Sequence, residues 1–394
     1  MPADRATQIE VVSVSGNTRT RRDTLLELLP RQPPARFSDA ELAEFERRVA
    51  NLAIFDRVVV ERSGATLKVA VREKWTLIPN FEFATSRTLA DSYALAGVTE
   101  YNAFGTGNQL ALQAYREQRG WGAMIAFTEH PYRRERWALD VAGSAATARV
   151  RFDDGSSWLS TQLGALAGFT SPPWLSDHLS YRAGGYYSRE LISDSVGNEL
   201  PPSSHALGTA LAFTWDDYRW ADFTPRGVRA DLNLSVGAFL GTQLPQARHL
   251  AQFELIWAQP LGRRAVLTAR AVGAVSTRGN AGFSQLLGSL MGVRGLEDGL
   301  FRNWLQTFGN FELRQALPLA ERWALQGVLF SDLAAFEQID ASGARGRPGS
   351  ACSVGVGARV IPTWLANVVL RLDLARLLSP SQTWFLQFGL NQYF

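Results

Sequence analysis

Hydrophobic and polar residues alternate along most of the chain after residue 78. Between Ile78 and Phe394, alternating segments recur about every 20 residues, and no stretch there keeps a helical period. Alternation with a period of two indicates β-strands with one apolar and one polar face. The region therefore predicts about sixteen antiparallel strands. We place them at residues 78–85, 92–103, 107–117, 120–130, 135–145, 158–170, 178–189, 205–216, 227–239, 247–258, 263–275, 304–315, 323–335, 351–361, 366–376 and 383–394.

The first 75 residues have a different pattern. Gln8–Ser15 alternates as a strand, Thr20–Leu29 has apolar residues at helical spacing, and residues 58–71 form two β-branched runs around a turn. Ser38 is followed three residues later by Glu41, the spacing of a helix capping box. The predicted order of this small unit is βααββ.

Composition decides between a soluble sandwich and a membrane barrel, since both alternate. Charged residues make up only 20% of the chain and aromatic residues 11%, yet no run of 18 apolar residues offers a transmembrane helix. This profile is typical of an amphipathic transmembrane β-barrel. Short connections such as Asp153–Gly155 and long ones such as Gln338–Ser350 predict periplasmic turns and outer loops. Eight tryptophans lie mostly near predicted strand ends, as membrane-interface girdles require: Trp158, Trp174, Trp220, Trp257, Trp304, Trp323, Trp364 and Trp384.

The last predicted strand is strongly amphipathic. Gln387, Gly389 and Asn391 lie on one face, and the chain stops at an aromatic residue on the other. A carboxyl-terminal aromatic on such a strand resembles the β-signal that outer-membrane barrels present to their insertion machinery. The apolar face carries Trp384, Leu386, Phe388, Leu390 and Phe394.

The remaining composition excludes several classes of protein. The net charge of +3 without a basic stripe gives no reason to expect nucleic-acid binding. A single cysteine, Cys352, excludes an intramolecular disulfide and a multi-cysteine zinc site. Four scattered histidines lack metal-ligand spacing, and no nucleophile elbow or Walker loop occurs. We therefore expect no enzyme, metal or cofactor; an enzymatic barrel would need Ser, His and Asp converging at the outer rim.

One long connection is the candidate functional segment. It spans residues 276–303 and carries Val293, Arg294 and Gly295. Connections of this length are uncommon and usually functional, so we interpret it as a loop folded into the barrel. The polar faces of the next strands carry Glu312 and Asp332, and must point inward because lipid penalises exposed carboxylates.

Arg294 is therefore expected to pair with Asp332 or Glu312 in the lumen, with bidentate geometry available to a guanidinium and a carboxylate. Such a pair would latch the loop inside the barrel. The alternative is that Arg294 is a solvated loop residue and Asp332 one of many lumenal charges.

Five ordered motifs resemble one family. They are Asn102–Gly107, Pro225–Gly227 after an Asp pair, Val293–Gly295, Gly309–Arg314 and Phe330–Asp332. Together they resemble the BamA/TamA superfamily of outer-membrane assembly and translocation barrels. The βααββ unit likewise resembles a POTRA domain.

The resemblance implies a POTRA-like periplasmic domain at residues 7–75 and a barrel of sixteen strands at residues 76–394 in the bacterial outer membrane. No apolar signal region starts the chain, so we expect a signal peptide to have been removed. Leu296 stands where the family usually has an aromatic residue, and stacking at that position is not expected.

The resemblance also implies a function, which is insertion of outer-membrane proteins or translocation of polypeptides. Pro79 in the first strand lacks an N–H and Gly389 weakens the last, which indicates a lateral seam held by few hydrogen bonds. Unfolded outer-membrane or secreted polypeptides would add a strand to the POTRA-like domain and pass to this seam. The expected partners are the lipid bilayer, these polypeptides and a periplasmic chaperone or accessory protein. The alternative is a passive pore or membrane anchor, serving a separate passenger.

Overall fold

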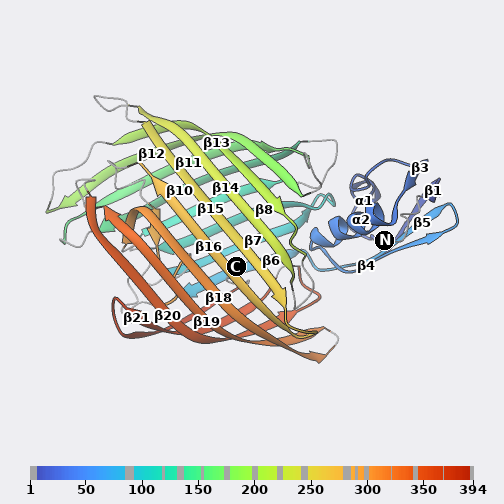
Figure 1. Ribbon diagram of the computed structural model, residues 1–394. Helices are drawn as coiled ribbons and strands as arrows, with labels where there is room; N and C mark the ends of the chain where they lie inside the picture. Colours follow the sequence, from blue (N-terminus) through green and yellow to red (C-terminus); the bar gives the residue numbers. More distant parts are fainter. Residues whose placement is uncertain are drawn as a thin grey trace.

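A closed barrel and a small N-terminal domain make up the molecule (Figure 1). The computed structural model describes residues 7–84, 93–117, 120–130, 137–151, 155–172, 178–197, 203–219, 225–240, 247–277, 285–288, 292–296, 301–320, 322–339, 345–366 and 368–390. The N-terminal domain lies beside one open end of the barrel, which we call the near end (Figure 1).

The N-terminal domain contains two small sheets and two helices. Strands β2, β5 and β4 form one sheet with β5 in the middle, parallel to β2 and antiparallel to β4, while β1 pairs with β3. The predicted capping box is present, because Ser38 accepts from the Glu41 amide and the Glu41 side chain accepts from the Ser38 amide. The elements are β1 (Thr7–Ile9), β2 (Val11–Ser15), α1 (Arg22–Leu26), β3 (Ala35–Phe37), α2 (Asp39–Asn51), β4 (Phe55–Ser63) and β5 (Thr66–Glu73).

Two details of this domain differ from the sequence prediction. The strand expected over Gln8–Ser15 is divided, because its first part pairs with β3 and its second part with β5. The helix expected over Thr20–Leu29 is only five residues long. Its N-cap, Arg21, makes no side-chain capping hydrogen bond, so the helix lacks a common start signal.

The barrel confirms the prediction of sixteen antiparallel strands in the described part of the chain. Consecutive strands pair with one another, and β22 closes the barrel on β6; a short additional strand, β17, pairs with the start of β18. The strands are β6 (Leu77–Ala84), β7 (Tyr93–Ala103), β8 (Asn108–Glu117), β9 (Gly120–Thr128), β10 (Ala138–Arg151), β11 (Ser157–Thr170), β12 (Leu179–Val196), β13 (Ser204–Asp216), β14 (Gly227–Leu240), β15 (Ala247–Pro260), β16 (Ala265–Ser276), β17 (Gln285–Leu287), β18 (Phe301–Ala320), β19 (Trp323–Ile339), β20 (Arg345–Pro362), β21 (Leu370–Ser379) and β22 (Thr383–Leu390).

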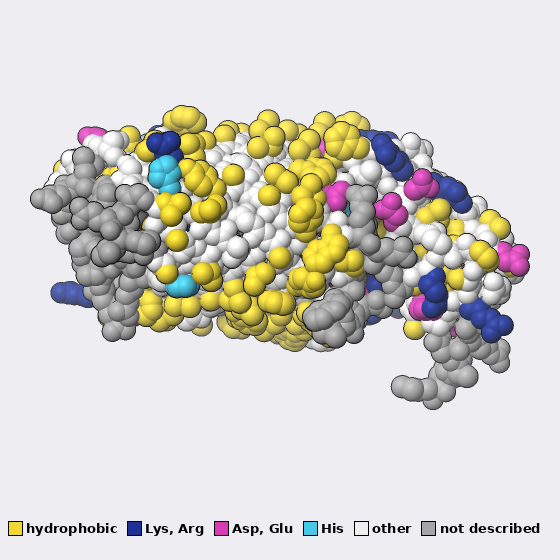
Figure 2. All heavy atoms as spheres, turned by 90° about the horizontal axis from the view of Figure 1, so that it is seen from above, with side chains coloured by type: hydrophobic (Ala, Val, Ile, Leu, Met, Phe, Trp, Pro, Cys, Tyr) yellow, Lys and Arg dark blue, Asp and Glu magenta, His cyan; other side chains and the backbone are white. Residues whose placement is uncertain are grey.

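Side chains alternate between the lumen and the outer surface, as the period-two pattern predicts. On β18, Asn310, Glu312 and Arg314 are buried, whereas Phe311 and Leu313 between them are exposed. Figure 2 shows hydrophobic side chains over the middle of the barrel, with charged side chains mostly towards its ends and on the N-terminal domain. This apolar outer band matches the hydrocarbon layer of a membrane.

One expectation about the barrel rim is wrong. Trp158 does not join an interfacial girdle, because it points into the lumen and packs with Val150 and Ile192. The turn predicted at Asp153–Gly155 falls mostly outside the described residues, which omit 152–154. Some strands are also longer than predicted, and β20 begins at Arg345, inside an expected long loop.

The N-terminal domain is attached to the near end through the turn at Asn102–Gly107. The Arg21 amide and the Thr24 hydroxyl donate to the Gly105 carbonyl at 2.8 and 3.1 Å, and Asn102 donates to the Thr20 hydroxyl at 3.0 Å. Gly105 has φ +73°, and a Cβ there would lie 2.5 Å from the Arg19 carbonyl oxygen. This turn therefore requires glycine to bring the two parts together. Among the described helices, none is long and apolar enough to cross a membrane.

Candidate functional site

The loop between β16 and β18 enters the lumen, where its tip (residues 292–296) is buried. The amides of Gly292 and Val293 both donate to the Gly288 carbonyl at 3.0 Å, which closes the loop into a tight turn. Apolar tip residues then join one lumenal cluster, so the tip is held partly by apolar contact. The cluster comprises Val272, Leu287, Val293, Leu296, Phe308, Ala334, Phe336, Ala351 and Leu377.

Arg294 at this tip is surrounded by acceptors from the barrel wall. Its Nε and Nη2 donate to the two carboxylate oxygens of Asp332 at 2.8 and 2.7 Å, and its Nη1 donates to Glu312 Oε1 at 2.5 Å. Its guanidinium carbon lies 3.5 Å from the centroid of the Phe330 ring. A bidentate ion pair and a cation–π contact therefore fix both the position and the plane of the guanidinium.

The structure thus brings together the five residues predicted to form the latch. Val293, Arg294, Glu312 and Asp332 have no exposed surface, and Gly295 follows Arg294 with φ +90°. A Cβ at Gly295 would meet its nearest neighbours at ordinary contact distance, so backbone conformation rather than space requires glycine there.

Neighbouring side chains support both carboxylates. Asn310 donates to the Gly292 carbonyl at 2.6 Å and to Asp332 Oδ1 at 2.9 Å, and the Ser353 hydroxyl donates to Asp332 Oδ2 at 3.3 Å. Arg314 Nε donates to Glu312 Oε2 at 2.6 Å. The wall therefore orients these acids before any contribution from the loop.

A second buried ion pair extends the cluster and was not predicted. Arg359 on β20 donates through Nη1 and Nη2 to the two oxygens of Asp373 on β21, at 2.6 and 3.2 Å. Arg371 Nε lies 3.8 Å from the same carboxylate. The signal was present in the sequence, because Arg371 and Asp373 alternate with leucines and share a lumenal face.

This cluster of buried charges contains four guanidiniums and three carboxylates among the described residues. Moving such groups out of water costs several kcal/mol per ion, and good pairing geometry is needed to offset that cost. A displaced loop would leave Asp332 without its guanidinium partner. The arrangement therefore strongly disfavours other positions of Arg294.

The first and last strands meet at a pairing that we call the seam. Within the described residues it consists of three pairs, Gln387 with Ala84, Phe388 with Phe83, and Gly389 with Glu82. By comparison, eight pairs join β21 to β22. Pro79 lies on β6 but pairs with β7 in the described residues, so it is not opposite Gly389.

The last strand places its apolar residues outward. Trp384, Leu386 and Phe388 are exposed on the outer surface, whereas Gln387 is buried. Leu390 ends β22 but its side chain lies outside the described residues, as does all of Phe394. The described part of the strand therefore has the amphipathic form of the predicted terminal signal.

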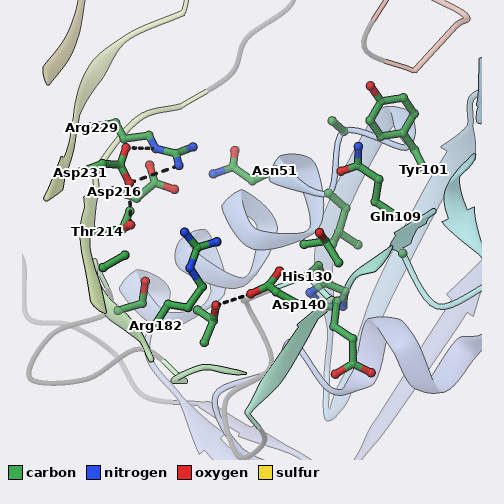
Figure 3. A pocket seen from close by; sticks show the side chains of 18 of the residues that line it. Asn51, Tyr101, Gln109, His130, Asp140, Arg182, Thr214, Asp216, Arg229 and Asp231 are labelled. Carbon is green, nitrogen blue, oxygen red and sulfur yellow. Dashed lines mark hydrogen bonds and ion pairs between the residues drawn. The ribbon is translucent and has the colours of Figure 1, made fainter. Parts of the chain in front are cut away.

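A cavity of about 480 Å³ lies where the N-terminal domain meets the lumen. Figure 3 shows Asn51 from the end of α2 beside it, with Arg229 and Asp231 on one wall and His130 and Asp140 on another. Arg229 Nε donates to Asp231 at 2.8 Å. The end of α2 therefore covers part of the near opening. Among the described residues no cluster of His, Cys, Asp and Glu is arranged to hold a metal ion.

A closed barrel with an apolar outer band and a loop fixed inside its lumen defines a bacterial outer-membrane barrel protein. Residues 102–378 match the Omp85 superfamily domain. This match covers more than half of the sequence, and the chain belongs to the Omp85 superfamily.

Individual relatives agree with this assignment. Over 169 residues, 41% of this chain, the sequence is 26% identical to the outer membrane protein assembly factor BamA of Neisseria meningitidis serogroup B, and the match covers 21% of that protein. The crystal structure of BamA from Haemophilus ducreyi lacking POTRA domains 1–3 has a TM-score of 0.56 at 14% identity, covering 98% of this chain and 85% of that one. CdiB from Acinetobacter baumannii has a TM-score of 0.66 at 12% identity, covering 98% and 74%. These structures share the fold.

Proposed function

We propose that the protein inserts polypeptides into the bacterial outer membrane or translocates them across it. Residues 7–75 would act as a POTRA-like periplasmic domain and residues 76–394 as the transmembrane barrel. The observation that carries the proposal is the Arg294 latch, a buried ion-pair cluster that fixes a loop inside the lumen. Membership of the Omp85 superfamily supports the same reading.

The N-terminal domain would receive the incoming chain. Its three-stranded sheet has two edges, β2 and β4, and Val11 on β2 is exposed. An extended polypeptide would pair with such an edge through main-chain hydrogen bonds, which do not depend on its sequence. A periplasmic chaperone or accessory protein would deliver that polypeptide unfolded.

The seam would then pass the chain into the bilayer. Each hydrogen bond lost between β22 and β6 is regained with a substrate strand, so exchange of partners is nearly balanced in free energy. Substrate side chains on the outer face would reach lipid directly. The Arg294 latch would keep the rest of the barrel in one shape during the exchange.

A reversible lock on the seam tests this function. In a Cys352→Ser background, Glu82→Cys with Gly389→Cys places two cysteines on paired positions, within reach of a disulfide. The control is Val141→Cys with Ala167→Cys, a pair between β10 and β11 far from the seam in strand order. Each protein is reconstituted in liposomes, and the folding of an added unfolded outer-membrane protein is followed by its protease-resistant fraction.

The seam disulfide should stop substrate insertion until reductant is added, whereas the control disulfide should not change it. Equal activity of the oxidised and reduced seam proteins would exclude the seam as the route. If the unlocked protein accelerates folding no more than empty liposomes do, the protein is a passive pore or anchor.

A further inference from the structure

The buried charges form a continuous row that extends past the latch towards the end of the chain. Glu312 Oε1 lies 2.5 Å from Arg294 Nη1 and 3.8 Å from Arg359 Nη2. Arg359 in turn is paired with Asp373, whose Oδ2 is also 3.8 Å from Arg294 Nη1. Opposite charges therefore alternate from the loop tip through β18 and β20 to β21, in an environment without exposed surface.

Asp373 is the member of this row that lies nearest the seam in strand order. It is paired in register with Gln387 on β22, and Gln387 is paired with Ala84 on β6. The carboxylate is thus one strand away from the seam, at the level where the seam forms. A movement of β21 at Asp373 would shift β22 directly, because the two strands are paired there.

We propose that Asp373 and Arg359 are positioning residues that couple docking of the loop to closure of the seam. The inference rests on the proposed function only for what the coupling is used for, because the coupling itself is measured without a substrate. When Arg294 is docked, Glu312 has a closer partner than Arg359, and Arg359 is left to hold Asp373. When the loop leaves, Glu312 loses that partner, and Arg359 moves towards it and releases Asp373.

Gly357 makes the second pair possible and offers a way to disturb it without changing charge. It lies opposite Asp373 in the register between β20 and β21. A Cβ on Gly357 would lie 2.2 Å from Asp373 Oδ1 and 2.7 Å from Arg359 Nη1. Gly357→Ala must therefore displace the paired groups. Gly327→Ala on β19 is the matched control, because nothing lies within 4 Å of a Cβ there.

Seam closure is measured as the rate of disulfide formation between Glu82→Cys and Gly389→Cys in the Cys352→Ser background, without any substrate. Asp373→Asn and Gly357→Ala should each slow this rate about tenfold, a typical size for coupling between two sites. The controls Gly327→Ala and Arg229→Gln should leave it unchanged; Arg229 belongs to a lumenal ion pair with Asp231, apart from the row.

Docking of the loop is measured separately, by disulfide formation between Gly295→Cys and Leu377→Cys. A Cβ at Gly295 would be 3.5 Å from the Leu377 Cβ, which suits a disulfide. The strain of a side chain at φ +90° is the same in every protein compared, because all of them carry the same two cysteines. This rate should remain near the parental value in Asp373→Asn and Gly357→Ala, because Asp332 and Glu312 hold Arg294 at much shorter distances than Asp373 does.

A double substitution tests the coupling itself. Arg294→Gln alone should slow seam closure about tenfold, but add less than about twofold in the Asp373→Asn background, because both act through one path. If the two substitutions instead slow seam closure by the product of their separate factors, the proposal is wrong. The proposal is also wrong if Gly357→Ala closes the seam at the parental rate, and this result is decisive if Asp373→Asn fails to assemble. Loss of loop docking in either variant would contradict it as well. If wild-type protein shows this coupling but inserts no substrate, the inference stands and the proposed function fails.

Discussion

Removal of the Arg294 side chain is expected to release the loop while the barrel stays folded. Arg294→Ala takes two side-chain hydrogen bonds from Asp332 and one from Glu312, both fully buried. Breaking a buried pair from one side costs about 3–5 kcal/mol. Glu312 keeps Arg314 at 2.6 Å, so the uncompensated charge is mainly that of Asp332. We therefore expect the lower value, about 3 kcal/mol, which is roughly a hundredfold fall in the ratio of docked to released loop.

The assay is disulfide formation between Gly295→Cys and Leu377→Cys in the Cys352→Ser background. In Arg294→Ala the rate should fall in proportion to the docked fraction, by up to about a hundredfold when the released loop predominates. Heat-modifiable migration in electrophoresis reports whether the barrel is folded, and this should be unchanged because the strand ladders do not involve Arg294.

A double substitution shows whether the unpaired carboxylate is the cause. Adding Asp332→Ala to Arg294→Ala removes the buried charge that the single substitution leaves behind, so docking should recover by about 1–2 kcal/mol. The unpaired Asp332 carboxylate is not the cause if the double variant docks less well than Arg294→Ala, or if Arg294→Ala alone docks as well as the parent protein. The first result would mean that the free-energy cost of the unpaired carboxylate has been set too high relative to the apolar contacts.

Three further expectations concern single contacts. Gly295→Ala should weaken loop docking by about 1 kcal/mol, because alanine is strained at positive φ; hydrogen exchange at the Arg294 amide, which donates to Asp332 Oδ2 at 3.0 Å, measures the change. Phe330→Leu should cost about 1–2 kcal/mol of docking through loss of the cation–π contact with Arg294; Phe311→Leu, at an exposed position on the outer face of β18, gives the control. Burial raises the pKa of Glu73, but hydrogen bonds from Thr20 and its neighbours outweigh it, so the pKa lies below its usual range. The ionised Glu73 therefore stabilises the N-terminal domain above the unfolded pKa of about 4.3, and this stabilisation is lost as pH falls through the folded pKa. Hydrogen exchange at the Thr20 amide should show the loss, and Glu73→Gln should remove its pH dependence.

The barrel was predictable because one physical rule acts on every strand. Lipid outside and water or protein inside give each strand a period of two, which survives in the sequence without any long-range information. Gly227–Leu240 and Thr383–Leu390 both coincide closely with predicted strands. The loop could also be located, since it interrupts that period and carries Arg294. Its partners followed from alternation, which places Glu312 and Asp332 on inward faces.

The contacts between strands could not be predicted, because the alternating pattern does not give the register between neighbouring strands. The pairing of Arg359 with Asp373 requires the shift between β20 and β21, which is set by their hydrogen-bond ladder and the tilt of the barrel. Trp158 illustrates another limit, because position near a strand end does not say whether a side chain faces lipid or lumen. Sequence gives faces well and partners across the barrel poorly.

Two kinds of contact hold the loop tip, and they have different consequences. The apolar cluster around Val293 and Leu296 contributes free energy in proportion to buried area, without a preferred direction. A shift of the tip by one residue would keep much of that contact. The same shift would place the Arg294 guanidinium against apolar side chains and leave Asp332 unpaired, which costs several kcal/mol. The apolar contacts therefore keep the loop inside the barrel, while the ion pairs select one register, and only a loop in one register can act on Arg359 and Asp373 in a defined way.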